Sequence, residues 1–407
     1  MKVYVETQGC SANRADTEQM LGLLEQAGHT VVDNSADADT VILNTCTVKG
    51  PTERAFFKRL KELDGKDVVV AGCIAQSEPK QLDGYTVVGP QEIDNIVNIV
   101  KQKGQHVDRT PMPNLNTPVK RANPLIDVIT INRGCLGYCT FCKTKSARGS
   151  LRSYTIEDIM QRFKQALADG CKEIWLTSQD TGCYGFDIGT NLPTLLNEML
   201  SVPGDYRIRV GMMNPDHLGH IMHDLAKVYQ DDRIFKFLHL PLQAGNDQVL
   251  KDMKRLYTQQ DYRDQIRFMT EQIPGLHVMT DIIVGFPTES DDQFLDTVSV
   301  LTSTKPESVN ISKFWPRPRT PAARMKPLQG HIVKARSKQV HELFETYRGD
   351  LQQQLLNKKV TVRFTEQKGA QVIGKDQYYR QVISDTHQVG DMVTSTVKKV
   401  GTFALFI

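Results

Sequence analysis

The chain has 407 residues, of which 40% are hydrophobic, so it can bury a sizeable core in two or three domains. Its net charge of +3, from 50 basic and 47 acidic residues, excludes a histone-like polycation but permits a local basic face. No apolar run approaches the length of a membrane span, and the first residues contain no signal-peptide segment. The 8 cysteines do not suggest a secreted disulfide framework. We therefore expect a cytoplasmic protein with no membrane association.

The first part of the chain, residues 1–105, alternates apolar strands with amphipathic helices. The predicted elements are, in chain order, a strand at Lys2–Glu6, a helix at about Asn13–Ala27, a strand at Thr40–Leu43, a helix at about Pro51–Leu63 and a strand at Asp67–Ala71. Strands that alternate with helices predict an open parallel α/β sheet.

Cys10, Cys46 and Cys73 each lie just past the end of one of these predicted strands. In open α/β sheets, ligands bind at the carboxyl ends of the strands. The three thiols, far apart in sequence, are therefore expected to converge and to hold a metal cluster. The alternative is three unrelated buried cysteines, because free cysteine is often a core residue.

Residues 106–124 are expected to be an extended linker, since they contain Pro111, Pro113, Pro118 and Pro124 but no apolar periodicity. Residues 125–345 then repeat a strand–helix unit. The predicted strands are Ile126–Asn132, Glu173–Thr177, Arg207–Gly211, Phe235–Pro241, Val278–Gly285 and Val309–Trp315. The repeat predicts a partial or full (β/α) barrel, whose chemistry sits at the carboxyl ends of the strands.

Cys135, Cys139 and Cys142 form a C-x3-C-x2-C run after the first of these strands. No fourth Cys or His at matching short spacing completes a structural zinc site. A [4Fe-4S] cluster held by three cysteines keeps one iron open for an outside ligand. That iron can chelate S-adenosylmethionine and reduce it to a 5′-deoxyadenosyl radical. An incomplete zinc site or three structural thiols are the alternatives.

The residues around this run resemble the radical S-adenosylmethionine methylthiotransferases. The resembling stretch is Arg133-Gly134-Cys135 through Cys142-Lys143-Thr144-Lys145, followed by Ala147-Arg148-Gly149 and Leu151-Arg152-Ser153. Its Cys-Lys-Thr-Lys continuation looks like the threonylcarbamoyladenosine tRNA branch, which archaea and eukaryotes share. Three further motifs look like the cluster-ligand motifs of the family, namely Gly9-Cys10-Ser11-Ala12-Asn13, Asn44-Thr45-Cys46-Thr47-Val48 and Gly72-Cys73-Ile74-Ala75-Gln76. The resemblance implies two [4Fe-4S] clusters, one on each cysteine triplet, and S-adenosylmethionine as cofactor.

Polar residues gather at the expected carboxyl ends of the barrel strands. The candidate contacts of S-adenosylmethionine are Gln179, Asp180, Asn214, Gln243 and Asp281, with Phe141 packed near the adenine and the backbone of Gly285 approaching it closely. Gln179 and Asp180 are alternatively loop caps, Gln243 a turn residue and Asp281 half of an internal salt bridge. Arg148, Arg152, Arg317 and Arg319 are candidate contacts of tRNA phosphate, although exposed arginines are common.

The last part, residues 346–407, changes to short alternating strands after a polar helix at about Lys334–Leu356. The predicted strands are Lys359–Phe364, Gln371–Ile373, Tyr378–Val382, Met392–Lys398 and Thr402–Phe406. They resemble the TRAM domain, a small RNA-binding β-barrel with an OB-like fold. Residues 351–407 hold eight Lys and Arg residues against four Asp and Glu. With Phe364, Tyr378 and Tyr379 among them, they suggest a surface for phosphates and bases. A solvated face over buried aromatic rings is the alternative.

The resemblance implies an enzyme that converts N6-threonylcarbamoyladenosine at position 37 of tRNA to its 2-methylthio derivative. Its expected partners are the tRNA anticodon stem-loop and an electron donor such as ferredoxin or flavodoxin, and we expect a monomer. Other branches of the family act on isopentenyladenosine tRNA or a ribosomal-protein aspartate. A non-catalytic iron–sulfur protein that binds RNA and senses redox state is a hypothesis of another class.

Overall fold

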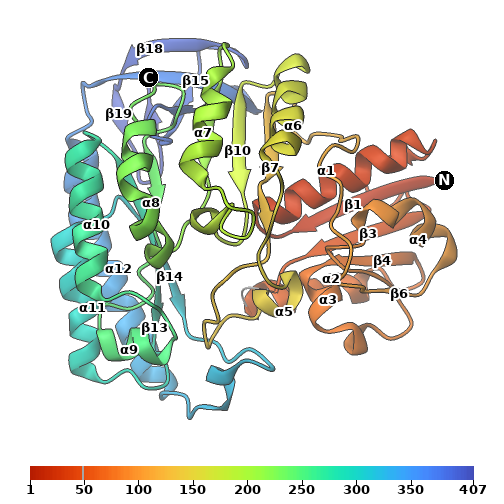
Figure 1. Cartoon of the computed structure of the whole chain (residues 1–407), viewed down its shortest axis with the longest axis horizontal. Helices are drawn as coiled ribbons and strands as arrows, with labels where there is room; N and C mark the ends of the chain where they lie inside the picture. The colour runs from red at the N-terminus through yellow and green to blue at the C-terminus, as the bar shows by residue number, and fades with distance from the viewer. Residues whose placement is uncertain (48–49) are drawn as a thin grey trace.

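Three units built around β-sheets follow one another along the chain in the computed structural model, which describes residues 1–47 and 50–407 (Figure 1). Val48, part of one cysteine motif, lies outside the described residues. In the described part, no helix is both long and apolar enough to cross a membrane. The first two units are α/β, and the third is a curled sheet of mostly antiparallel strands, so the predicted fold class is confirmed.

The first sheet is fully parallel, with the strand order β2-β1-β3-β4-β5-β6. Its strands are β1 (Lys2–Gln8), β2 (Thr30–Val31), β3 (Thr40–Thr45), β4 (Asp67–Gly72), β5 (Thr86–Val88) and β6 (Gln105–His106). Its helices are α1 (Ser11–Gln26), α2 (Gly50–Glu62), α3 (Cys73–Ser77) and α4 (Ile96–Gln102). Alternate residues of β3 serve opposite faces, because Ile42 packs with α1 and α4, whereas Val41 packs with α2 and α3.

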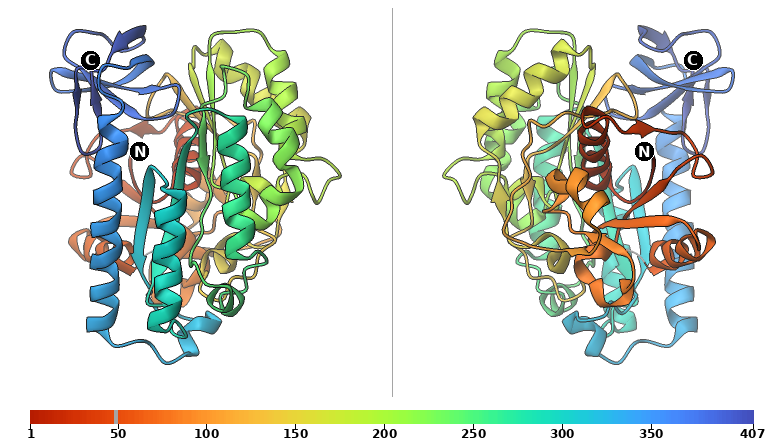
Figure 2. Two further views of the ribbon diagram at one scale, coloured as in Figure 1. Left: turned by 90° about the vertical axis from the view of Figure 1, so that its left-hand side faces the viewer. Right: turned by 90° about the vertical axis from the view of Figure 1, so that its right-hand side faces the viewer.

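The second unit is an arc of six parallel strands rather than a closed barrel. Its two three-stranded sheets, β11-β10-β7 and β12-β13-β14, are joined by a parallel bridge between Ile208 and Ile234. The strands are β7 (Ile126–Thr130), β10 (Glu173–Thr177), β11 (Arg207–Val210), β12 (Phe237–His239), β13 (His277–Val284) and β14 (Ser308–Lys313). The long helices α6 (Ile156–Ala168), α7 (Leu192–Ser201), α8 (Pro215–Val228), α10 (Gln259–Gln272) and α11 (Asp291–Thr304) line the outside (Figure 2).

Residues 107–125 contain no helix or strand, in keeping with the expected linker. The expected boundary at residue 345 falls inside the 24-residue helix α12 (Gly330–Gln353), which leads to the third sheet. That sheet has the order β18-β15-β16-β17-β20-β19. Its strands are β15 (Lys359–Lys368), β16 (Gln371–Asp376), β17 (Gln381–Ser384), β18 (Met392–Thr396), β19 (Lys399–Val400) and β20 (Leu405–Phe406). β15 pairs with β18 and β16 and carries a bulge after Phe364, which curls the sheet as in a small barrel.

The C-terminal sheet covers the amino ends of the barrel strands. The backbone N–H of Lys236 donates to the carbonyl of Gln377 (2.8 Å), and the side chain of Arg207 donates to the carbonyl of Thr361 (3.2 Å). In Figure 1 this sheet lies at the top, whereas the arrow of β10 points down toward α5 (Thr144–Arg148). The C-terminal sheet therefore lies at the opposite end of the barrel from the Cys135–Cys142 loop, which immediately precedes α5.

His277 lies in this interface and should make it sensitive to acid. Burial, together with the positive charge of Arg380, lowers the pKa of His277 from 6.5 to about 3. Below pH 6.5 His277 therefore binds a proton in the unfolded chain but not in the folded chain, so the free energy of unfolding falls as the pH drops. Between pH 7.5 and 5 we expect the wild type to lose about 2 kcal/mol relative to His277→Gln in urea unfolding.

The comparison isolates His277 because neighbouring groups titrate in both proteins. Burial raises the pKa of Glu307 to about 7, which shifts stability in the opposite direction, but equally in the wild type and the variant. Parallel curves of stability against pH for the two proteins would contradict the prediction.

Candidate metal-cluster sites

The loop Cys135–Cys142 is held from two sides. The N–H and hydroxyl of Thr140 donate to the carbonyls of Met253 (3.0 Å) and Asp252 (2.9 Å), at the end of α9 (Asp247–Asp252). The N–H of Ala322 donates to the carbonyl of Thr140 (3.0 Å), and that of Cys142 to the carbonyl of Cys139 (3.1 Å). The backbone that carries the three thiols is therefore fixed before any ligand binds.

Two of the three sulfur atoms of this loop lie near Gly137. Its N–H donates to Sγ of Cys135 (3.2 Å), and a Cβ at Gly137 would lie 3.5 Å from Sγ of Cys135 and 3.7 Å from Sγ of Cys139. Arg255 donates to Sγ of Cys139 at 3.2 Å. Burial raises the pKa of Cys135 to about 12 and also raises that of Cys139. Buried thiols of this kind become thiolates when a metal holds them, so the donor set fits an iron–sulfur cluster.

Two of the predicted contacts reach this loop through hydrogen bonds. Gln179 accepts from the N–H of Gly134 at 2.7 Å, directly before Cys135. Asn214, at the start of α8, accepts from Arg255, the residue that also donates to Cys139. Gln179 and Asn214 thus lie beside the cysteine loop, as expected of residues near a cofactor there; their contact with S-adenosylmethionine stays a prediction.

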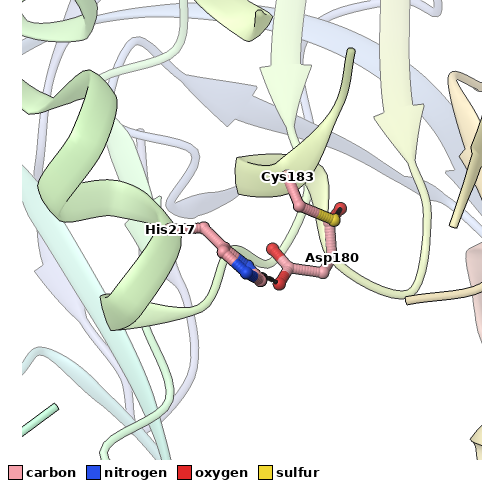
Figure 3. Close-up of side chains that lie close together, drawn as sticks. All are labelled: Asp180, Cys183 and His217. Carbon is pink, nitrogen blue, oxygen red and sulfur yellow. Dashed lines mark hydrogen bonds and ion pairs between the residues drawn. The ribbon is translucent and has the colours of Figure 1, made fainter. Parts of the chain in front are cut away.

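Asp180 is buried and links two of the loops that follow the barrel strands through hydrogen bonds (Figure 3). Its Oδ1 accepts from the N–H groups of Gly182 (3.0 Å) and Asn214 (3.1 Å), and its Oδ2 bonds Nδ1 of His217 at 2.5 Å. Burial alone would lower the pKa of His217, but the hydrogen bond to Asp180 together with the charges of Asp180 and Asp216 raises it above its usual value. Three internal donors occupy this carboxylate, so it positions the loop; a further contact with S-adenosylmethionine stays a prediction.

Cys183 completes a group whose ligand atoms, with those of Asp180 and His217, all lie within 4.8 Å of one another. Its thiol donates to the carbonyl of Asp180 at 3.3 Å, and burial raises its pKa. Because Asp180 and His217 are already hydrogen-bonded to each other, the group is satisfied as a polar network and does not need a metal.

Replacing Asp180 by alanine should destabilise the barrel strongly. Two buried N–H groups and the ring of His217 would lose their acceptor, which we expect to cost about 3 kcal/mol in urea unfolding. Asp232→Ala is the matched control, because Asp232 is exposed and should change stability by less than about 0.5 kcal/mol. Equal stability of the two variants would contradict this stabilising role of Asp180.

Of the remaining predicted contacts of S-adenosylmethionine, two take part in interactions within the barrel, and a third packs on an apolar cluster. Asp281 bonds Nε2 of His239 (2.8 Å) and accepts from Asn310 (2.7 Å), which is the internal pair considered as its alternative. Gln243 has a positive φ of 67° and pairs through its backbone with residues of β13, so it is also a turn residue. The half-buried ring of Phe141 packs on a small apolar cluster that includes Phe286.

Gly285 differs from the expectation that its backbone faces an adenine. Its φ is +77°, and a Cβ there would lie 2.6 Å from the side chain of Val333 on α12. Its N–H donates to Glu289 at 2.9 Å. The space that a side chain would fill is therefore taken by α12, and glycine is required by the turn and by this packing.

The second triplet lies at three neighbouring strand ends. β1, β3 and β4 are adjacent in the sheet, and Gln8, Thr45 and Gly72 are aligned across them. Thr45 and Gly72 directly precede Cys46 and Cys73, and Gln8 lies two residues before Cys10. The side chain of Cys10 is exposed, whereas those of Cys46 and Cys73 are buried. Burial raises the pKa of Cys73, with a further contribution from nearby Cys10. These donors also fit a cluster held by three thiolates.

Amide side chains form hydrogen bonds between the cysteine loops at this edge of the first sheet. Asn13 donates to Oδ1 of Asn44 (3.0 Å) and to the carbonyl of Thr45 (3.1 Å), and Asn44 donates in return to the carbonyl of Asn13 (2.8 Å). Sγ of Cys10 donates to Oδ1 of Asn13 at 3.4 Å. Asn13 therefore links two of the cysteine loops.

Arg148 joins the two cysteine sites. It lies on α5, shortly after Cys142, and its Nε donates to Sγ of Cys73 at 3.4 Å. It also forms an ion pair with Asp16 (2.7 Å), which pairs in addition with Arg133 (2.9 Å). All three charged side chains are buried. The segment that follows the barrel cysteines therefore lies against the carboxyl edge of the first sheet, beside Cys73.

Two arginines do not take the positions expected for contacts of tRNA phosphate. Arg148 is buried in the junction just described, and Arg317 is buried against Thr47 and Glu53 of the first unit. Arg152 donates to backbone carbonyls of the linker, and Arg319 is exposed but pairs with Glu78 at 2.7 Å. Sequence reasoning missed the burial because the acidic partners are distant in the chain.

The comparisons with known proteins agree with this geometry. Residues 129–301 match the family model of the radical SAM superfamily, and residues 2–88 match that of the uncharacterized protein family UPF0004. Among solved structures, a radical S-adenosylmethionine methyltransferase from Kitasatospora setae has a TM-score of 0.57 at 14% identity, over 79% of this chain and 75% of its own. The barrel thus has the fold of the radical SAM proteins.

Curated relatives identify the family within the radical SAM proteins more closely. A threonylcarbamoyladenosine tRNA methylthiotransferase of Mus musculus is 42% identical over 85% of this chain, and a probable one of Pyrococcus abyssi is 39% identical over 98%. The chain spans 63% of the length of the mouse protein, less than two thirds, and 97% of the archaeal one. The chain belongs to the family of threonylcarbamoyladenosine tRNA methylthiotransferases.

Proposed function

We propose that the protein is a radical SAM enzyme that converts N6-threonylcarbamoyladenosine at position 37 of tRNA to its 2-methylthio derivative. The observation that supports the proposal is the contact of Arg148, which shortly follows the barrel cysteines in the chain, with Cys73 of the other triplet at the carboxyl edge of the first sheet. The names of the relatives supply the substrate class, and the radical SAM match supplies the chemistry.

The barrel site would hold a [4Fe-4S] cluster through Cys135, Cys139 and Cys142. Such a cluster, when bound, supplies the electron for reductive cleavage of S-adenosylmethionine. Gln179 and Thr140 fix the loop from opposite ends, and Arg255 places positive charge beside the sulfur of Cys139. The protein thereby orients the cofactor and offsets the negative charge of the thiolates.

Cys10, Cys46 and Cys73 would hold the second cluster, from which sulfur reaches the substrate. Arg148 offsets thiolate charge there as Arg255 does in the barrel, and Asn13 fixes two of the three loops. We also propose that an external donor such as ferredoxin or flavodoxin supplies electrons, and that the enzyme works as a cytoplasmic monomer.

The C-terminal sheet, residues 346–407, would act as a TRAM-like domain that binds the anticodon stem-loop. Its excess of basic residues supports this role. Of the aromatic residues expected on its surface, Phe364 belongs instead to the core of the sheet, so RNA bases would have to stack elsewhere.

Nucleoside mass spectrometry tests the proposed substrate. The anaerobically reconstituted protein is given S-adenosylmethionine, a reductant and a sulfur source, with tRNA that carries either threonylcarbamoyladenosine or isopentenyladenosine. We expect the methylthio product only from the first. Modification of isopentenyladenosine alone, or of a ribosomal-protein aspartate offered in parallel, would overturn the substrate assignment while preserving the chemistry.

Calorimetry with S-adenosylmethionine separates the enzyme from a redox sensor. The reconstituted protein should bind S-adenosylmethionine, and Cys135→Ala should not, because its open iron site is lost. Clusters with no affinity for S-adenosylmethionine would favour a non-catalytic RNA-binding sensor.

A further inference from the structure

A large cavity lies at the amino end of the barrel, away from both cysteine triplets. Its volume is about 1090 Å³, and its walls come from the starts of the barrel strands, from the end of α12 and from the C-terminal sheet. Beside the cavity, the backbone N–H of Lys236 and the ring of His277 are hydrogen-bonded to carbonyls of the C-terminal segment, so the sheet is fastened to the barrel here.

The lining is strongly basic. Its cationic residues are Arg209, Arg348, Lys358, Lys359, Lys375 and Arg380, and its only carboxylate among the described residues is Glu307. Burial raises the pKa of Glu307 to about 7, so even this carboxyl group is partly neutral at physiological pH. A concave surface with this excess of positive charge attracts anions.

Two of these cations are unpartnered within the described structure. Arg209 forms no ion pair, its Nε is buried without a hydrogen-bond partner, and its guanidinium lies over the rings of Phe237 (5.4 Å) and Tyr379 (5.3 Å). Lys375 likewise forms no side-chain hydrogen bond or ion pair there, and its ammonium lies 5.1 Å from the ring of Tyr379. Burial lowers the pKa of Lys375, and the charges of the nearby carboxyl groups of Glu173, Glu366 and Asp376 only partly offset this effect. A bound anion would satisfy both groups.

Aromatic rings accompany the charges. Tyr378 and Tyr379 line the cavity, and Phe403 stands at its rim with 76% of its surface exposed. Arg348 lies 4.3 Å from the ring of Phe403, and Arg380 lies 4.4 Å from that of Tyr378. Cations beside accessible rings are the combination that binds a phosphate and stacks the attached base.

We propose that this cavity binds the phosphate of a nucleotide, either free or within an RNA strand, at the end of the barrel remote from the reaction. Its basic walls would hold the phosphate, and the rings at its rim would stack the base. The proposal does not depend on the methylthiotransferase activity, because none of the lining residues belongs to the cysteine sites.

Binding measurements with matched variants test the proposal. The probes are AMP, by calorimetry, and a 5′-phosphorylated single-stranded RNA, by fluorescence anisotropy, each over a range of salt concentrations. The test variant is Lys359→Gln/Arg380→Gln, which removes two rim charges. The control is Lys164→Gln/Lys334→Gln, which removes two exposed charges of the barrel helices α6 and α12 outside the cavity.

We expect the rim variant to weaken binding about tenfold and the control to leave it nearly unchanged. Weakened AMP binding identifies a free nucleotide as a ligand. Binding of RNA alone, with the salt slope of the rim variant reduced by about one per lost contact, identifies a strand. Equal losses in rim variant and control, or no binding of either probe, would overturn the proposal. A far-ultraviolet circular dichroism spectrum like that of the wild type verifies that the rim variant is folded.

Discussion

Cys135→Ala is expected to abolish both the formation of 5′-deoxyadenosine and the methylthiolation of tRNA, whereas Cys46→Ala is expected to abolish only the second. The reason is the division of labour between the two triplets. Cys135 belongs to the fixed barrel loop, where the cofactor binds, and Cys46 follows β3 in the first sheet. Removing one of three thiolates leaves a cluster without sufficient ligands, while the other site keeps its own three.

The measurement combines nucleoside mass spectrometry with quantification of 5′-deoxyadenosine and with iron and sulfide content after anaerobic reconstitution. Each single variant should lose about half of the iron, since one of two sites is affected. Cys171→Ala is the control, because Cys171 is buried in the barrel core near the end of α6 and should retain both reactions. Deoxyadenosine formed at the wild-type rate by Cys135→Ala would contradict the assignment of the barrel triplet.

The alternation of strand and helix could be predicted from the sequence because its cause is local. In β3, Val41 and Ile42 point to opposite faces that are both covered by helices, so the strand is a continuous apolar run. The positions of Cys10, Cys46 and Cys73 follow from the same pattern, since a residue just past a parallel strand must lie at the carboxyl edge.

The C-terminal strands show where local pattern fails. Alternating residues predict a strand at Tyr378–Val382, but Asp376 accepts from the N–H groups of Tyr378 (2.9 Å) and Arg380 (2.8 Å). An aspartate that bonds the backbone a few residues ahead favours a turn, so β17 begins only at Gln381. The signal was present in the sequence, and the alternation concealed it.

The charged partners of the cysteines could not be predicted, because they depend on contacts between distant segments. Arg148 was interpreted as a surface arginine, and Arg255 was not singled out at all, yet each donates to a cysteine sulfur. The same holds for Asp180, whose three donors come from two different strand ends. Sequence showed which residue types gather at the carboxyl edges, but the packing of the two units decides which of them face the thiols and which hold the loops.

Arg148→Met should therefore damage the junction more than any exposed substitution. The change retains much of the apolar stem but removes the guanidinium from Asp16 and Cys73, and it leaves the buried Asp16 carboxylate with Arg133 as its remaining ion-pair partner. Breaking a buried ion pair from one side costs about 3–5 kcal/mol, and we expect a loss of this size in urea unfolding. Lys101→Met, at an exposed site on α4, should be nearly neutral.

A double-mutant cycle distinguishes the ion pair from a simple packing defect. If Asp16 and Arg148 stabilise each other, Arg148→Met combined with Asp16→Asn should cost clearly less than the sum of the single changes. Strict additivity would show that the charges do not couple, and Arg148 would then contribute only through its packing. Coupling, in contrast, would mean that the guanidinium beside the sulfur of Cys73 also holds the barrel against the first sheet. Loss of the contact between the two units and disturbance of the second cysteine triplet would then have the same cause, the removal of Arg148.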